Sequence, residues 1–124
     1  MTWDAAIVLL RAPDGRVLGV TRGDDLRDIN LPGGAREPED ASPVATARRE
    51  LHEETGIRVR TLRPLAAWTQ RGKRVVAFQG VTWSGRVRSS DEGMAGWVPP
   101  EHLTRASCKY QRENSKLLSW TLIS

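Results

Sequence analysis

The nine residues from Arg49 to Ile57 constrain this 124-residue chain more than any other segment. They read Arg-Glu-Leu-His-Glu-Glu-Thr-Gly-Ile, within a stretch whose pattern is helical. On a helix, Glu50, Glu53 and Glu54 lie at i, i+3 and i+4 and share one face about 100° wide. Carboxylates this close repel one another, and a divalent cation would reverse that cost because hard cations take oxygen ligands. The spacing is therefore typical of half of a metal site.

The same glutamates have a plainer interpretation, a solvated acidic helix face. Glutamate is a good helix former, and Arg49 and Glu53 form an ordinary i,i+4 pair. The surrounding pattern decides against that interpretation. Residues 49–57 follow Arg-Glu-aliphatic-any-Glu-Glu-any-Gly-aliphatic, which a random sequence of average composition matches roughly once in 10⁷ starting positions.

The helix that carries the glutamates is predicted from Pro43 to Thr55. Ser42 is a favourable N-cap, and proline fits the first helical position that follows it. Apolar residues recur at helical spacing and would face a core, and Gly56 is the expected left-handed terminator. The apolar stripe consists of Val44, Ala47 and Leu51.

Strands are expected on both sides of this helix. The apolar run Ala5–Leu10 stops at a Pro-Asp-Gly turn, and Val17–Val20 follows it, so we expect the two to form a hairpin. The polar segment 23–34 is predicted to be a loop. Later strands and a closing helix are expected at Arg58–Trp68, Arg74–Trp83, Gly96–Val98 and Gln111–Leu122. This order indicates a layered α/β domain.

Composition limits the class of protein. Hydrophobic residues make up 39% and charged residues 27%, which is ordinary globular usage, and the length suits one domain over residues 1–124. A single cysteine, Cys108, excludes a disulfide-built scaffold. No apolar run is long enough to span a membrane, and the N-terminus does not resemble a signal peptide. We therefore expect a cytoplasmic protein with no membrane partner.

The pattern at residues 49–57 is the signature of the Nudix box, and the chain resembles a small, MutT-like Nudix hydrolase. The box covers about residues 33–57, and Leu31-Pro32-Gly33-Gly34 and Glu37 also match the family's usual approach to the helix. The strand pattern matches more loosely over essentially the whole chain. The resemblance implies the Nudix α/β/α sandwich, with a mixed β-sheet between helices.

One feature of the box departs from the family pattern. The family places a glutamate six residues after the glycine, and seven residues then precede the arginine. Here Asp40 lies six residues after Gly34, and eight residues, 41–48, precede Arg49. The extra residue falls where the chain approaches the helix, in a loop that can absorb it. The departure leaves the three helix glutamates in place and puts only the role of Asp40 in doubt.

The resemblance implies roles for the residues of the box. Glu50 and Glu54 would be the principal ligands of Mg²⁺, with Mn²⁺ as a substitute. Glu53 would be a third or water-bridged ligand, and the carbonyl of Gly33 would complete the shell. Arg49 would orient a glutamate through a salt bridge. The general base would be Glu53 or an acid in the loop before the last strand.

Three residues outside the box are further candidates, each with an alternative interpretation. Glu92, within Ser-Asp-Glu-Gly, would be the acid of that loop as a ligand or base, or part of a polar turn. Arg22 would contact a phosphate or be solvated. Asn114 would hydrogen-bond a nucleobase at the start of the last helix, or cap that helix.

The implied reaction is hydrolysis of a phosphoanhydride in a nucleoside diphosphate linked to a group X. A nucleoside triphosphate, as in nucleotide-pool sanitation, is the first expectation. A nucleotide sugar, a dinucleoside polyphosphate and a non-catalytic nucleotide-binding module are the alternatives. The net charge of +4 suits such an anionic small-molecule partner, and equally suits a solvated surface. No basic cluster with interleaved aromatics points to nucleic acid. The sequence does not decide between a monomer and a homodimer.

Overall fold

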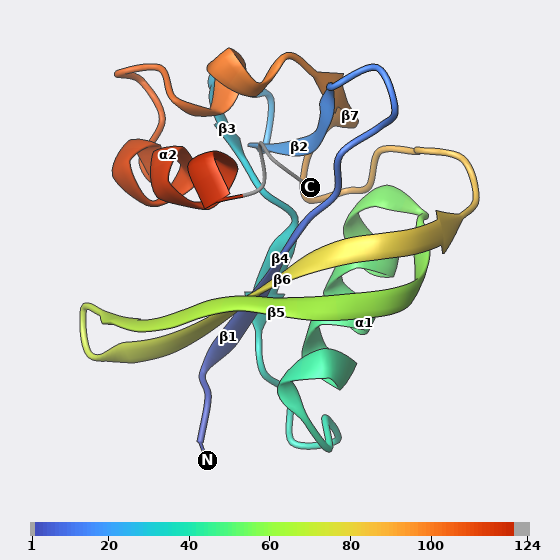
Figure 1. The fold of residues 1–124 in the computed structure, drawn as a ribbon, viewed down its shortest axis with the longest axis vertical. Coiled ribbons are helices and arrows are strands. Elements are labelled where there is room, and N and C mark those ends of the chain that lie inside the picture. Colours follow the sequence, from blue (N-terminus) through green and yellow to red (C-terminus); the bar gives the residue numbers. More distant parts are fainter. Residues whose placement is uncertain (1, 121–124) are drawn as a thin grey trace.

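The computed structural model describes residues 2–120, which form two β-sheets and two α-helices (Figure 1). The elements in chain order are β1 (Ala5–Leu9), β2 (Val17–Arg22), β3 (Asp25–Asn30), β4 (Gly33–Ala35), α1 (Pro43–Thr55), β5 (Arg58–Gln70), β6 (Lys73–Ser84), β7 (Ala95–Val98), the 3-10 helix η1 (Pro100–Leu103) and α2 (Gln111–Trp120).

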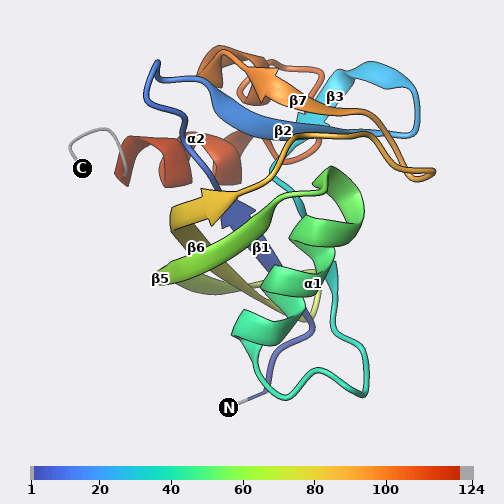
Figure 2. The same cartoon turned by 90° about the vertical axis from the view of Figure 1, so that its right-hand side faces the viewer.

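The larger sheet is mixed and has the strand order β4-β1-β6-β5. Strand β1 runs parallel to β6 and antiparallel to β4, and β5 runs antiparallel to β6. The smaller sheet is antiparallel, in the order β3-β2-β7. Figure 2 shows α1 and α2 on opposite sides of the larger sheet. This arrangement confirms the expected α/β/α sandwich.

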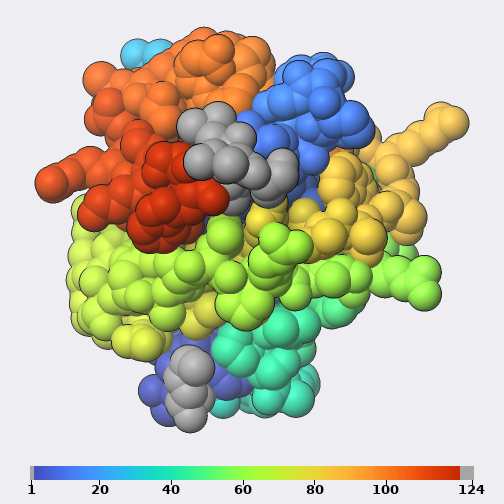
Figure 3. All heavy atoms as spheres, viewed as in Figure 1, coloured from blue at the N-terminus to red at the C-terminus, as the bar shows by residue number. Residues whose placement is uncertain are grey.

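The side chains of β1 show how the larger sheet packs against α1 on one face and α2 on the other. Successive side chains of a strand point to opposite faces. Ala6 and Val8 belong to the buried cluster on the α1 side, which also contains Leu51 of that helix. Leu9 belongs to the second cluster, which contains Leu117 of α2. Figure 3 shows α2 lying against β5, where the two elements are in contact.

Helix α1 begins and ends where the sequence predicts. The Ser42 side chain accepts a hydrogen bond from the Ala45 N–H at 3.2 Å. Gly56 follows the helix in the left-handed region, with φ 78°, and its N–H bonds to the His52 carbonyl. Within the expected apolar stripe, Ala47 and Leu51 are fully buried. The glutamate-bearing segment is therefore held at both ends and along one side.

Three expectations about the strands were wrong. Segment 23–34, predicted to be a loop, contains β3 and the start of β4. The expected hairpin of the first two strands does not form, because β1 and β2 belong to different sheets. The segments after β1 and before β2 are connected instead by an isolated bridge between Arg11 and Val17 and by bonds from the Leu18 N–H to the Leu10 carbonyl and from the Ala12 N–H to the Arg16 carbonyl. Strands β5 and β6 are also longer than predicted.

Helix α2 starts at Gln111, as predicted, and is described as far as Trp120. The end of the predicted helix, residues 121–122, lies outside the described residues. Among residues 2–120, neither helix has the length and apolar character needed to cross a bilayer.

Candidate functional site

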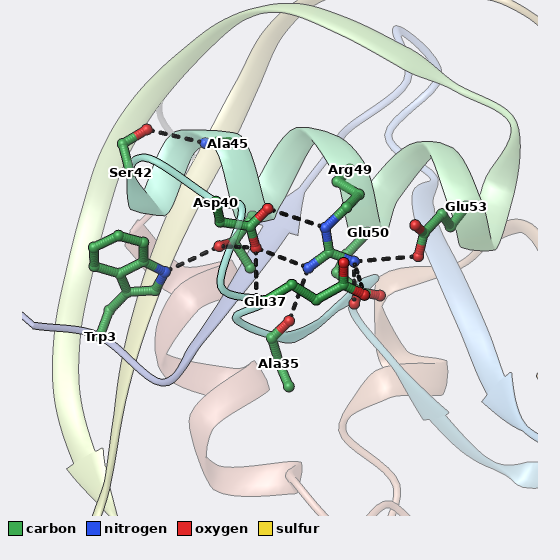
Figure 4. A network of polar contacts seen from close by, with 10 residues as sticks. Trp3, Ala35, Glu37, Asp40, Ser42, Ala45, Arg49, Glu50 and Glu53 are labelled. Carbon is green, nitrogen blue, oxygen red and sulfur yellow. Dashed lines mark hydrogen bonds and ion pairs between the residues drawn. The ribbon is translucent and has the colours of Figure 1, made fainter.

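Arg49 links the glutamates of α1 to the segment that leads into the helix (Figure 4). Its Nη1 donates to Glu50 Oε1 at 3.0 Å and to Glu53 Oε2 at 3.3 Å. Its Nε and Nη2 donate to the two oxygens of Asp40 at 3.1 and 2.9 Å. Arg49 thus contacts two of the expected metal ligands, as a residue that orients glutamates must.

Asp40 is a partner of Arg49, despite the shift in spacing. It is buried, and its hydrogen bonds with Arg49 hold the pKa of the carboxyl well below its usual range. The pKa of Arg49 is raised, first by Asp40 and then by Glu50. The shorter acid and the extra residue therefore preserve an ion pair at the position where the family pattern has a glutamate.

Glu54 lies beside the start of β4. Its Oε1 accepts a hydrogen bond from the Gly33 N–H at 2.8 Å. Burial raises the pKa of Glu54 to about 7, the Gly33 N–H opposes that rise, and the charges of Glu50 and Glu92 add to it. Burial also raises the pKa of Glu50, against the influence of Arg49. The site therefore contains carboxylates that would be stabilised by positive charge.

Two consecutive glycines bring β4 close to these carboxylates. A Cβ at Gly34 would lie 2.5 Å from Cδ of Glu50, and a Cβ at Gly33 would overlap the carbonyl oxygen of Ala6. The neighbour of Gly33 is backbone, so only glycine fits there, whereas a side chain at position 34 would displace the movable end of Glu50. Strand β4 can thus approach Glu50 closely while it pairs with β1.

The carboxylates fit a hard divalent cation by their chemistry. Glu50 and Glu54 are partly buried oxygen donors whose ionised forms are disfavoured by burial, a cost that a bound Mg²⁺ or Mn²⁺ would relieve. The side chains are nevertheless not gathered into a ligand cage. Over residues 2–120, no three His, Cys, Asp or Glu side chains converge closely enough to hold a metal ion. Arg49 and the Gly33 N–H are instead the partners of these carboxylates.

A cavity of about 410 Å³ lies next to Glu54 and is of the size that binds small ligands. It brings together five of the residues singled out from the sequence: Arg22, Gly33, Glu54, Glu92 and Asn114. The pairing of β2 with β7 and a bridge between Gly23 and Gly93 place Arg22 beside the loop of Glu92. Glu50, Glu53 and Arg49 are not among its lining residues.

A larger cavity, of about 680 Å³, lies beside Trp3, Arg36 and Lys73. None of the three α1 glutamates lines it. We assign the site to the smaller cavity because it contains Glu54 and Glu92.

Asn114 does not cap α2, and that alternative was wrong. The helix begins at Gln111, so Asn114 lies inside its first turns. The side chain is 2% exposed, and its Nδ2 donates to the Leu103 carbonyl at 2.9 Å. This bond connects α2 to η1 at the edge of the cavity.

Asn30 and Trp68 also line the cavity and were not singled out from the sequence. Nδ2 of Asn30 donates to Asp28, while its Oδ1 is buried without a hydrogen-bond partner. The position of Asn30 directly before Leu-Pro-Gly-Gly could have drawn attention to it. Trp68 gave no comparable signal, because a tryptophan in a strand is equally typical of core packing.

The fold and the site define an α/β/α protein with a glutamate-bearing helix beside a cavity of ligand size. The family model described as "NUDIX domain" matches residues 1–121, and the chain belongs to the Nudix family.

A "MutT-like protein" of Streptomyces ambofaciens is 36% identical over 94 residues, which cover 73% of this chain and 60% of that protein. The chain thus spans less than two thirds of the length of this curated relative.

Solved structures of MutT proteins share the fold. A structure from work on the MutT of Aliivibrio salmonicida and Vibrio cholerae superposes with a TM-score of 0.76 at 18% identity, covering 95% of this chain and 98% of that one. MutT of Methanosarcina mazei gives a TM-score of 0.68 at 25% identity, covering 95% and 93%. The first likeness, at its low identity, shows the fold alone.

Proposed function

We propose that this chain is a divalent-metal-dependent hydrolase that cleaves a phosphoanhydride bond of a nucleoside diphosphate linked to a group X. The observation that carries the proposal is the Glu54 carboxylate. It is partly buried, has a raised pKa, and lines a cavity together with Arg22, Glu92 and Asn114. A site with acidic and basic groups on one cavity suits a phosphorylated ligand with a cation bound to it.

The residues that would hold the cation are Glu50 and Glu54, with Glu53 as a third or water-bridged ligand and the Gly33 carbonyl completing the shell. When bound, Mg²⁺ or Mn²⁺ would supply charge neutralisation on the phosphates and activation of the attacking water. Arg49 would hold Glu50 and Glu53 in place through the two contacts described above.

Glu92 is the better candidate for the general base. A base must lie within reach of the water it deprotonates. Glu92 lines the cavity, whereas Glu53 does not line it and has its carboxylate 3.3 Å from Arg49 Nη1. We therefore assign the proton transfer to Glu92 and orientation of the ligand shell to Glu53.

Arg22 and Asn114 would bind the nucleotide. Arg22 brings a cation to the cavity, which suits a phosphate. Asn114 brings an amide from α2 to the same cavity, and amides pair with nucleobase edges. The first candidate for the substrate is a nucleoside triphosphate, and nucleotide sugars and dinucleoside polyphosphates remain the alternatives.

The test is phosphate or pyrophosphate release from a panel of nucleoside triphosphates, nucleotide sugars and dinucleoside polyphosphates. Each is assayed with Mg²⁺, with Mn²⁺ and with excess EDTA. We expect turnover that disappears in EDTA and returns when the cation is restored. Turnover that persists in EDTA would refute metal dependence, and nucleotide binding without turnover would favour a non-catalytic nucleotide-binding module.

A further inference from the structure

A chain of buried hydrogen bonds runs from the segment before β1 to helix α1 (Figure 4). The indole Nε1 of Trp3 donates to Thr46 Oγ1 at 3.0 Å, and Thr46 Oγ1 donates to Asp40 Oδ2 at 2.7 Å. Trp3 is 7% exposed, Thr46 0% and Asp40 8%. Water therefore does not compete readily for these bonds.

The direction of each bond is fixed by chemistry. An indole N–H can only donate, and an ionised carboxylate can only accept. The Thr46 hydroxyl must therefore accept from Trp3 and donate to Asp40, so it has one arrangement. A hydroxyl with a single hydrogen-bonding arrangement helps to hold the neighbouring Asp40 carboxylate in one position.

Asp40 transmits this constraint to Arg49. Its Oδ2 accepts from Thr46, from the Glu37 N–H at 2.9 Å and from Arg49 Nη2 at 2.9 Å, while its Oδ1 accepts from Arg49 Nε. Two parallel bonds between a guanidinium and a carboxylate fix the plane of the guanidinium. The remaining nitrogen, Nη1, then reaches Glu50.

This support lies at the place where the chain departs from the family pattern. Asp40 is one methylene shorter than a glutamate, and the extra residue lengthens the loop between Asp40 and α1. The Thr46 hydroxyl connects that loop directly to the first turns of α1.

We propose that Trp3 and Thr46 are positioning residues that act through Asp40 and Arg49 to fix the Glu50 carboxylate for cation binding. The proposal rests on the proposed function, because it concerns the same cation site. Neither residue lines the cavity that contains Glu54. Their effect is therefore indirect and should appear in the affinity for the cation.

The experiment measures Mn²⁺ binding to the metal-free protein by the EPR signal of free Mn²⁺. Thr46→Val removes the hydroxyl at nearly constant shape, and Thr46→Ser keeps the hydroxyl. We expect Thr46→Val to weaken Mn²⁺ binding about tenfold, as outer-shell changes do, and Thr46→Ser to stay close to wild type. Equal affinity of wild type and Thr46→Val, or equal weakening by both variants, would overturn the proposal.

Thr55→Val is the matched control for lost stability. Thr55 is also fully buried in α1, and its hydroxyl donates to the Leu51 carbonyl at 2.6 Å without touching Asp40 or Arg49. We expect it to lower the melting temperature and leave Mn²⁺ affinity unchanged. A similar loss of affinity in Thr55→Val and Thr46→Val would mean that destabilised α1 alone accounts for the effect, which would overturn the proposal.

Turnover provides an independent readout. A positioning role predicts that Thr46→Val raises the Mg²⁺ concentration for half-maximal turnover and leaves kcat at saturating Mg²⁺ near the wild-type value. A purely structural role predicts a lower kcat with an unchanged Mg²⁺ requirement. If Thr46→Val does not fold, Trp3→Phe replaces it, because phenylalanine keeps a ring beside Arg36 and loses the N–H donor. Wild-type Mn²⁺ affinity in Trp3→Phe would then overturn the proposal.

These experiments distinguish failure of the proposed function from failure of the positioning role of Trp3 and Thr46. Wild-type protein that neither binds Mn²⁺ nor hydrolyses any nucleotide would overturn the proposed function and this inference with it. Wild-type protein that does both, beside a Thr46→Val variant with unchanged cation affinity, would overturn the inference alone.

Discussion

The Glu54 carboxylate accepts a hydrogen bond from Gly33 and otherwise lies in a partly buried position beside other acids. Its pKa is raised from 4.5 to about 7, mainly by burial. The folded state consequently binds more protons than the unfolded state between these two values. The metal-free protein should therefore lose stability as the pH rises through that window, and the loss should be complete above it.

Glu54→Gln separates the proposed metal-ligand role of this residue from its cost to stability. Glutamine keeps an oxygen for the Gly33 N–H and cannot ionise, so the metal-free variant should be at least as stable as wild type at about pH 8. Losing one ligand charge should lower kcat by at least about 100-fold. Thermal unfolding in EDTA and steady-state kinetics measure the two effects. A large fall in the melting temperature of the variant would instead indicate a structural role.

Asn114 has a structural contact as well as a place in the cavity, and a pair of variants distinguishes the two roles. Asn114→Ala leaves the buried Leu103 carbonyl without its donor, at a cost of about 1–3 kcal/mol. If Asn114 also reads the base, KM for the preferred nucleotide should rise and the ranking among bases should flatten. The kcat for a poor substrate should hardly change.

Gln111→Ala is the control for Asn114→Ala. Nε2 of Gln111 donates to the Thr104 carbonyl at 2.8 Å, so this residue also joins α2 to the segment that follows η1. It does not line the cavity that Asn114 lines. We expect Gln111→Ala to change stability and leave the base ranking intact. An unchanged ranking in Asn114→Ala as well would exclude base recognition by Asn114.

At the scale of elements, the close approach of β4 to α1 determines where Glu50 can lie. In Gly34→Ala the new Cβ would meet the end of the Glu50 side chain, which can move, so we expect the fold to persist. The displaced carboxylate should bind Mn²⁺ about tenfold more weakly. Calorimetric titration with Mn²⁺ measures the change. Gly96→Ala is the control, because its Cβ would meet open space. Wild-type affinity in Gly34→Ala would show that Glu50 does not need its present position.

The elements that could be predicted from the sequence are those whose signals are local. Helix α1 has its own caps and apolar stripe, so its bounds follow from neighbouring residues. Strand β3 has a single buried residue, Ile29, among polar neighbours, and β4 consists of two glycines and Ala35. Their strand conformation comes from pairing with β2 and β1, which is tertiary information. The failed hairpin has the same cause, since proximity in sequence did not decide which strands pair.

The same distinction between local signals and tertiary pairing holds for the candidate site. Helical spacing was enough to place Glu50, Glu53 and Glu54 on α1, although over residues 2–120 no three acidic, histidine or cysteine side chains converge closely enough to hold a metal ion. It could not show that Arg22 and Glu92 line one cavity, because that depends on the pairing of β2 with β7 and on the Gly23–Gly93 bridge. Asn114 was assigned correctly to the last helix, but its bond to Leu103 required the position of η1.

At the scale of the whole molecule, cation binding and pH should be coupled through the stability of the fold. A cation that binds only the folded state stabilises it by about 2.7 kcal/mol at 100 times its Kd. Ligand carboxylates must be ionised to bind it, so protons compete with the cation. Because the pKa of Glu54 is about 7, this competition should extend to neutral pH.

Thermal unfolding of the wild-type protein with Mg²⁺ and with EDTA, at several pH values, measures that coupling. Below the ordinary pKa of a glutamate the two melting curves should nearly coincide. Glu54 and Glu50 are then protonated, so they neither bind the cation nor repel each other. They should separate progressively as the pH rises through about 7, since EDTA exposes the repulsion that Mg²⁺ removes. In Glu54→Gln the separation should be smaller and should lose its rise near pH 7. Equal stabilisation by Mg²⁺ at low and high pH, in both proteins, would place the cation on other groups and remove Glu54 from the proposed site.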